Sequence, residues 1–146
     1  MLALLPLFWM GCNKEDQFEV DKGLILEYIS NNNLDALSTD EGVYYVINTQ
    51  GSGANPDIND EVTVDYEGFL LDGTKFDSSL DRGTPATFAL LNVIRGWQIG
   101  IPLVKEGGNI TLLIPSDLAY GSNPPAGSAI PRDAVLRFEV DLIEIG

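Results

Sequence analysis

Apolar and polar residues alternate with a period of two over most of the chain after residue 41, which is typical of strands with one face in a core. In EVTVDYEGFL (61–70), Val62, Val64 and Tyr66 share one face and polar side chains occupy the other. Similar patterns predict strands in GVYYVIN (42–48), KFD (75–77), ATFAL (86–90), NITLLIP (109–115) and AVLRFEVDLIEI (134–145). Short strands of this kind predict an antiparallel sheet.

Two segments have the spacing of a helix instead. Residues 18–37 carry apolar side chains three and four positions apart, which predicts an amphipathic helix. These side chains are Leu24, Ile25, Tyr28, Ile29 and Leu34. The helix should end near residues 31–33, because asparagine tolerates the left-handed conformation of a helix end, and we expect it to be a spacer or a packing arm. A shorter helix is expected over 95–104, and Pro102 should kink or end it because proline lacks the N–H donor.

Glycine, proline, asparagine and aspartate gather between these segments and predict turns. Asp72-Gly73 is typical of a hairpin, Gly107-Gly108 predicts a second turn, and residues 51–60 form a loop. Residues 119–132 form a longer loop, whose length favours a functional role over a plain connection. The order of elements predicts an α+β fold in which one short helix covers a face of an antiparallel sheet, with a helical arm at the N-terminus.

The first ten residues, MLALLPLFWM, are apolar and too short to span a bilayer. They resemble the apolar part of a secretory signal; the basic residues that usually precede it are missing, so we expect the natural start to lie upstream. Gly11-Cys12 follows and resembles a lipidation site of bacterial lipoproteins, although Trp9 fits that pattern poorly. The place of Cys12 directly after the apolar run favours lipidation over an incidental cysteine.

The sequence therefore predicts three parts. Residues 1–11 are expected to be the remnant of a lipoprotein signal peptide, 12–40 a lipidated tether with the helical arm, and 41–146 the folded domain. An acyl chain on Cys12 would attach the protein to a membrane without a spanning helix. Lys14-Glu15-Asp16 resembles a surface-export signal of Gram-negative lipoproteins, with a solvated tether as an equal alternative. The expected location is the outer membrane of the cell envelope, facing the periplasm or the cell surface.

The 22 acidic and 8 basic residues give a formal net charge of −14. This charge argues against nucleic-acid binding, because phosphate backbones require a cationic surface. The chain has no histidine, which excludes Ser-His and Cys-His nucleophile pairs, histidine bases and histidine-ligated zinc. A single cysteine excludes an internal disulfide. Catalysis would have to use carboxylates, hydroxyls, backbone groups or shape, and we expect no metal and no other cofactor.

The stretch VIRGWQIG (93–100) places Trp97 between glycines in an aliphatic run. Because glycine is a poor helix former, this pattern indicates either an awkward core residue or the floor of a ligand site. We expect Gly96 to leave room for backbone and substrate beside the indole, and Gly100 to let the sheet approach the helix. An indole sealed under other side chains, with no cavity above it, would contradict the ligand-site interpretation.

Four motifs occur in a fixed order: Tyr66-x-Gly68, GTKFDSS (73–79), Val93-Ile94-x-Gly96-Trp97, and Tyr120-Gly121 before a proline-rich loop. Together they make residues 41–146 resemble the FKBP-type peptidyl-prolyl cis-trans isomerases, also called rotamases, in a bacterial exported lipoprotein form. The resemblance implies a bent antiparallel sheet wrapped around one short helix. It also implies an aromatic pocket between the sheet and the helix that receives a proline ring.

The resemblance assigns residues of this chain to that pocket. The expected catalytic residues are Tyr66, Phe76, Asp77, Ile94, Trp97, Tyr120 and Phe138. The expected substrate-binding residues are Phe88, Val93 and Ile130, and Arg82 is expected to support Asp77. The resemblance implies that the N–H of Ile94 and the hydroxyl of Tyr120 hold substrate carbonyls. We expect Asp77 to orient Tyr66 rather than to act as an acid or base, because a bond rotation requires no proton transfer.

The implied activity is rotation about X-Pro peptide bonds, which would assist the folding of envelope or surface proteins. The implied partners are X-Pro-containing polypeptides, with macrolide inhibitors of the family as ligands. Two alternatives stay open: a catalytically weak FKBP-like module that holds Pro-containing segments, and a lipoprotein that uses the domain as an adhesive scaffold. Without the resemblance, Tyr66, Phe88 and Phe138 would be ordinary core residues. The loop after Tyr120 and the segment AIPR (129–132) depart from compact family members, which leaves substrate preference open.

Overall fold

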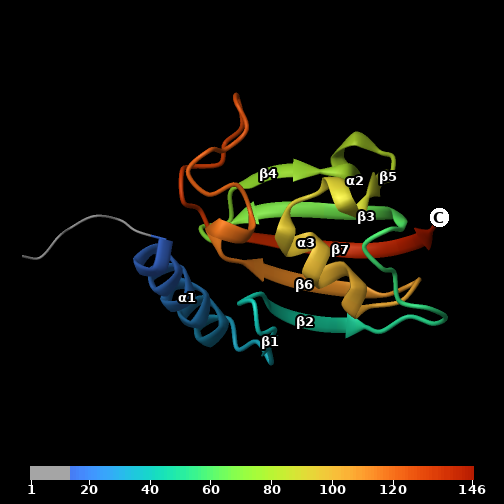
Figure 1. Ribbon diagram of the computed structural model, residues 1–146, viewed down its shortest axis with the longest axis horizontal. Coiled ribbons are helices and arrows are strands. Elements are labelled where there is room, and N and C mark those ends of the chain that lie inside the picture. Colours follow the sequence, from blue (N-terminus) through green and yellow to red (C-terminus); the bar gives the residue numbers. More distant parts are fainter. Residues whose placement is uncertain (1–13) are drawn as a thin grey trace, which may run out of the picture.

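The computed structural model describes residues 14–146 (Figure 1), so the predictions for residues 1–13, including lipidation of Cys12, lie outside the described residues. The strands are β1 (Leu37–Ser38), β2 (Tyr44–Thr49), β3 (Glu61–Leu70), β4 (Lys75–Ser78), β5 (Ala86–Ala89), β6 (Asn109–Ile114) and β7 (Leu136–Ile145). The helices are α1 (Lys14–Asn31), α2 (Ser79–Arg82) and α3 (Arg95–Gly100), with 3₁₀ turns η1 (Leu90–Asn92), η2 (Ile101–Leu103) and η3 (Ser116–Leu118). The strands form one antiparallel sheet in the order β1-β2-β6-β7-β3-β4, and β5 pairs with the first half of β3. This architecture confirms the predicted α+β fold.

The helix α3 lies across one face of the sheet, over the main core (Figure 1). Two glycines on one side of α3 allow this close approach. A Cβ atom at Gly96 would lie 2.4 Å from Cγ2 of Ile114, and one at Gly100 would lie 2.5 Å from Cδ2 of Leu112. The prediction for Gly100 is confirmed. The prediction for Gly96 was wrong, because the space that Gly96 leaves is filled by Ile114 of β6 and not by a substrate.

The helix α3 ends earlier than the predicted range of 95–104. It stops at Gly100, and the chain continues as the 3₁₀ turn η2, which contains Pro102. This ending agrees with the expectation that Pro102 terminates the helix. The short helix α2 was not predicted, although its signals are present: the Ser78 side chain accepts the N–H of Asp81 at 3.0 Å, and Gly83 follows with a φ of 78°. These are the usual caps of a helix start and a helix end.

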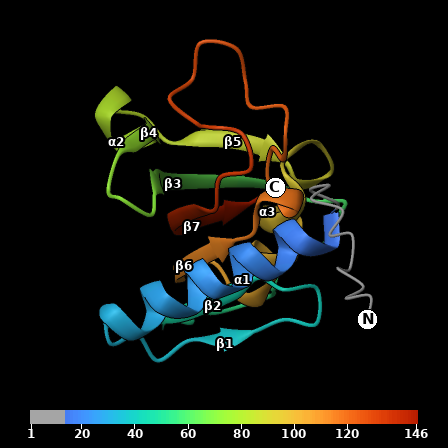
Figure 2. The same ribbon diagram turned by 90° about the vertical axis from the view of Figure 1, so that its left-hand side faces the viewer.

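The helix α1 crosses one end of the sheet (Figure 2), where it contacts η3 and packs against side chains of β2 and β6 that point away from α3. Its Ile25 is fully buried against Leu113 and Val135. Because neighbouring residues of a strand point to opposite faces, Leu112 contacts the α3 side and Leu113 contacts α1. The helical arm is therefore a packed part of the domain. None of the helices within residues 14–146 is long and apolar enough to cross a membrane.

The bounds of α1 differ from the predicted range of 18–37. The helix begins at Lys14 and ends at Asn31, and Asn33 follows with a φ of 52°. The expected left-handed asparagine at the helix end is thus confirmed. Leu37 lies outside the helix, because it pairs with Tyr45 as part of β1.

Candidate active site

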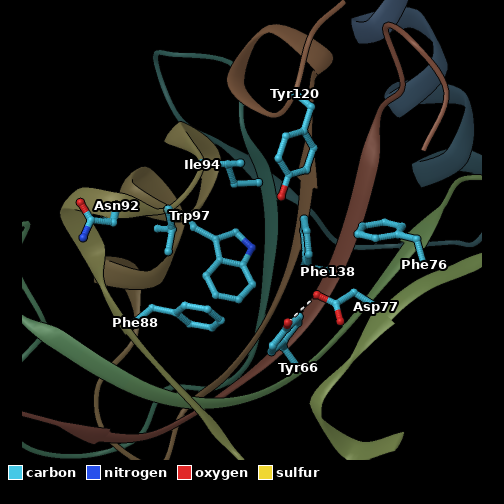
Figure 3. A pocket seen from close by; sticks show the side chains of 10 residues that line it. Tyr66, Phe76, Asp77, Phe88, Asn92, Ile94, Trp97, Tyr120 and Phe138 are labelled. Carbon is cyan, nitrogen blue, oxygen red and sulfur yellow. Dashed lines mark hydrogen bonds between the residues drawn. The ribbon is translucent and has the colours of Figure 1, made fainter. Parts of the chain in front are cut away.

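A cavity of about 240 Å³ opens between the start of α3, the sheet and the loop that follows η3 (Figure 3). Its walls are formed by Tyr66, Phe76, Asp77, Phe88, Asn92, Val93, Ile94, Trp97, Tyr120 and Phe138. All of these except Asn92 are residues that the sequence assigned to the pocket. The fold therefore brings together side chains from β3, β4, β5, β7 and the start of α3, which lie up to 72 positions apart between residues 66 and 138.

Trp97 lies at the centre of the aromatic cluster. Its indole is 5.1 Å from the ring centroid of Tyr66, 5.5 Å from Phe88 and 5.2 Å from Phe138. The interplanar angles lie between 82° and 86°, the edge-to-face geometry that aromatic pairs prefer. The indole is only 4% exposed, yet it lines the open cavity (Figure 3). Trp97 is thus held rigidly at its edges while open space remains beside it, which is the geometry that a ligand site requires.

Gly68 explains how two further rings reach the cavity. A Cβ atom at Gly68 would lie 2.6 Å from Cζ of Phe76 and 2.9 Å from Cε1 of Phe138. These two rings meet edge to face at 5.5 Å. They occupy the position above β3 where another residue would place its side chain. The glycine of the Tyr66-x-Gly68 motif is therefore a steric requirement of the aromatic wall.

Asp77 is the centre of a hydrogen-bond network on the sheet side of the cavity. The Tyr66 hydroxyl donates to Oδ2 of Asp77 at 2.5 Å (Figure 3). Arg82 donates to Oδ1 of Asp77 at 2.6 Å and to the Tyr66 hydroxyl at 3.1 Å, and the N–H of Ser78 donates to the same Oδ1 at 2.9 Å. Each partner predicted for Asp77 is present. The contacts from Arg82 and Ser78 hold Asp77 in place, and Asp77 and Arg82 together fix the direction of the Tyr66 ring.

The ionisation of this network follows from its contacts. Burial raises the pKa of Tyr66, and the hydrogen bond to Asp77 raises it further. Partial burial alone would raise the pKa of Asp77, but the hydrogen bonds from Tyr66 and Arg82 outweigh it and hold this pKa below its usual value. Burial raises the pKa of Tyr120 as well, helped by the negative charge of Asp77. At neutral pH the cavity therefore contains one carboxylate and two neutral phenols.

Three donors near the cavity have no acceptor within the described part of the chain, and one of them is the buried Nε1–H of Trp97. The Tyr120 hydroxyl points into the cavity (Figure 3) and takes part in no hydrogen bond among residues 14–146. The N–H of Ile94 is likewise unused there, whereas the Ile94 carbonyl accepts the N–H groups of Trp97 at 3.0 Å and Gln98 at 3.2 Å. Residues 14–146 contain no group of three acidic or cysteine side chains that could hold a metal ion. The chemical resources of the cavity are aromatic surface and hydrogen-bond donors.

The sequence model of the FKBP-type peptidyl-prolyl cis-trans isomerases matches residues 53–143. The chain belongs to this family. An FKBP-type isomerase of Aeromonas hydrophila, FkpA, is 51% identical over 108 residues, which cover 74% of this chain and 40% of that protein. This FKBP chain spans about two fifths of the length of the first curated relatives.

Solved structures show the same fold. The crystal structure of FkpA from Escherichia coli aligns with a TM-score of 0.76 at 33% identity, over 90% of this chain and 63% of that chain. A peptidyl-prolyl isomerase of Pseudomonas syringae pv. tomato aligns with a TM-score of 0.77 at 29% identity, over 94% of this chain and 98% of that chain. The FKBP fold of this chain therefore extends to α1, which lies before the matched residues 53–143.

The residues that line the FKBP cavity differ from the predicted set at two positions. Ile130 is 7% exposed and packs into the main core, and it is not among the residues that line the cavity. Asn92 lines the cavity, although no motif or pattern in the sequence predicted it. It is the last residue of η1. Its position directly before the Val93-Ile94 motif is the one feature of the sequence that could have indicated a place in the cavity. Arg82 lies behind the wall and contacts Tyr66 and Asp77, as predicted.

Proposed function

We propose that this chain is a peptidyl-prolyl cis-trans isomerase that accelerates rotation about X-Pro peptide bonds. The observation that supports this most directly is the open aromatic cavity beside Trp97, with the donors of Tyr120 and Ile94 at its edge. A proline ring is apolar and compact, and it suits a cavity lined by six aromatic side chains. The preceding carbonyl and its neighbour can accept hydrogen bonds from the two donors.

The chemistry of the proposed reaction explains why such a cavity suffices. An amide resists rotation by about 18–20 kcal/mol because twisting destroys its resonance, and X-Pro bonds isomerise over tens to hundreds of seconds without help. The planar amide is more charge-separated than the twisted one, so an apolar cavity favours the twisted form. Each 1.4 kcal/mol or so of preferential stabilisation accelerates the rotation about tenfold. No nucleophile, metal ion or proton transfer is needed.

Asp77 has an orienting role in this proposal. Both of its oxygens are engaged by Tyr66, Arg82 and Ser78, so its contacts are directed at the wall and not at a substrate. With Tyr66 fixed, the aromatic rings around Trp97 keep their edge-to-face positions before a substrate arrives. A preformed site avoids the cost of ordering these rings during binding.

We also propose that the protein is a lipoprotein of the cell envelope, with an acyl anchor on Cys12 and with X-Pro-containing polypeptides and family macrolides as its ligands. The apolar run of residues 1–10 and the adjacent Gly11-Cys12 support the anchor. Metabolic labelling with a fatty-acid analogue should mark the natural protein and not a Cys12→Ser variant. Protease treatment of intact cells should then distinguish the surface side of the outer membrane from the periplasmic side.

The isomerase activity can be tested with a proline-containing tetrapeptide whose cis-to-trans relaxation is followed in real time. We expect the purified protein to accelerate this relaxation and a macrolide inhibitor of the family to abolish the effect. Phe76→Ala should lower kcat/KM by at least about tenfold, because it removes one wall of the cavity. Lys75→Ala, on the exposed side of the same strand, is the matched control. Binding of the peptide without any acceleration would instead identify a holding module.

A further inference from the structure

Asp21 is a fully buried acidic side chain on α1, outside the cavity. Its Oδ2 accepts the backbone N–H of Ser116 at 2.8 Å and the Ser116 hydroxyl at 2.5 Å. Its Oδ1 accepts from Gln17 at 2.8 Å, one turn earlier on the same helix. Burial of a carboxyl group is costly unless its oxygens are hydrogen-bonded, and here both oxygens are. The contact links two segments that are 95 positions apart.

Ser116 in turn holds the backbone on both sides of Tyr120. Its carbonyl accepts the N–H of Ala119 at 3.0 Å and the N–H of Gly121 at 2.8 Å. The carbonyl of Gly121 then accepts the N–H of Asp133 at 2.8 Å, which closes the long loop before β7. Asp21 therefore reaches the peptide units that flank Tyr120 through a single intermediate residue, Ser116.

The Tyr120 ring depends on this backbone for its place. Its hydroxyl points into the cavity and has no hydrogen-bond partner among the described residues (Figure 3). The hydroxyl of Tyr66, by contrast, is fixed directly by Asp77 and Arg82. A shift of the Ser116–Leu118 turn would thus move Tyr120 with no side-chain hydrogen bond among the described residues to resist it, although its ring packs against the core. Displacements of this kind are costly, because about 1 Å at a site can lower a rate substantially.

We propose that Asp21 is a positioning residue of the isomerase site, which acts through Ser116 on Tyr120. The proposal rests on the proposed isomerase function. Under this proposal α1 helps to position a residue of the active site, although α1 lies outside the residues 53–143 that match the family. The helix places a carboxylate at the one turn whose backbone controls the cavity wall opposite Asp77.

A double-mutant cycle between Asp21 and Tyr120 tests the proposal. Asp21→Asn removes the negative charge and one of the two acceptor oxygens, which weakens the charge-assisted hydrogen bonds from Ser116. We expect it to lower kcat/KM about threefold to tenfold. In a Tyr120→Phe background the same change should cost less than about twofold, because the hydroxyl that it misplaces is already gone. Ile25→Val is the matched control. It loosens the apolar contact of the same helix, and kcat/KM should stay within about twofold of the wild type.

Amide hydrogen exchange gives a readout that does not depend on activity. In Asp21→Asn the amides of Ala119 and Gly121 should exchange about tenfold faster than in Ile25→Val, while the amides of β6 should be unchanged. An active wild type combined with an unchanged or strictly additive Asp21→Asn variant would overturn the positioning role. An inactive wild type would instead overturn the proposed isomerase function, and the exchange of the two amides would still show whether Asp21 holds the turn.

Discussion

The two sides of the cavity are held in different ways. On the sheet side, Tyr66 is tied by hydrogen bonds to Asp77 and Arg82. On the loop side, the Tyr120 hydroxyl has no hydrogen-bond partner among residues 14–146; its ring packs against the core, and its flanking backbone is anchored through Ser116. The sheet side is thus held by side-chain hydrogen bonds as well as by packing, whereas the loop side is held by packing and by its backbone. Changes on the sheet side should lower stability and activity together, and changes on the loop side should lower activity alone.

The largest expected effect is that of Gly68→Ala on the sheet side. The new Cβ atom would lie within 2.9 Å of both the Phe76 and the Phe138 rings, so these rings must move into the cavity or away from it. We expect a loss of about 1–3 kcal/mol in the free energy of unfolding and about a hundredfold loss in kcat/KM. Denaturant titration and the tetrapeptide assay measure the two quantities.

Gly23→Ala is the control for this change. Gly23 lies in α1, and a Cβ atom there would meet nothing within 4 Å. Alanine is the better helix former by about 0.5–1 kcal/mol, so the variant should be slightly more stable and fully active. If Gly68→Ala behaved like Gly23→Ala, the two rings would not form the rigid wall described above.

Asp77→Ala should have the next largest effect. It leaves the Tyr66 hydroxyl and Arg82 without their common acceptor. Because Asp77 is partly exposed, with 39% of its side-chain area accessible, we expect a modest loss of about 1–2 kcal/mol in stability. The kcat/KM value should fall about tenfold as Tyr66 loses its orientation. A catalytic acid would show a far larger loss in kcat with unchanged stability, which would contradict the orienting role.

The sequence predicted the residues on the sheet side of the site well, but it did not predict the contacts between segments that are far apart along the chain. Alternation in β3 and β7 placed Tyr66 and Phe138 on the inner face, and the structure has both there. The partners of Asp77 followed from the resemblance and from the nearness of Arg82 along the chain. These features could be predicted because they depend on local periodicity and on short spacings along the chain. The alternation of apolar and polar residues in a strand indicates which of its faces is buried.

Contacts between distant segments could not be predicted in this way. The partner of Asp21 lies 95 positions away, and nothing in either segment indicates the pairing. The role predicted for Gly96 was wrong for the same reason. The side chain that fills the space beside Gly96 belongs to Ile114, which lies on β6. Ile130 was assigned by its place before Pro131, but the turns of a long loop carry no periodicity, and its side chain packs into the core.

On the loop side, Tyr120→Phe should separate activity from stability. The hydroxyl has no partner among residues 14–146, so its removal should change the free energy of unfolding by less than about 0.5 kcal/mol. The kcat/KM value should nevertheless fall about threefold to tenfold, because one donor to the substrate is lost. A stability loss as large as that of Asp77→Ala would mean that the two sides are held alike.

The smallest effect is expected from pH. The pKa of Asp77 lies below its ordinary value of 3.8, and the pKa values of Tyr66 and Tyr120 lie above 10.0. No cavity group therefore changes charge between about pH 5 and pH 9, and kcat/KM should be constant there. The stability from Asp77 is complete above pH 3.8 and is lost as the pH falls through its folded pKa.

The stability from Tyr66 has the opposite sign. It is complete below pH 10.0 and is lost as the pH rises through the folded pKa, because burial and the hydrogen bond to Asp77 both favour the neutral phenol. Denaturant titrations across the pH range should thus give a plateau with a decline at each end. Asp77→Ala should remove the contribution of Asp77 to the acid decline and should reduce the alkaline decline only in part, because burial still raises the pKa of Tyr66. Tyr120→Phe should also reduce the alkaline decline in part, because burial raises the pKa of Tyr120 as well. A bell-shaped kcat/KM profile near neutral pH would show that a group outside this network takes part in the rotation.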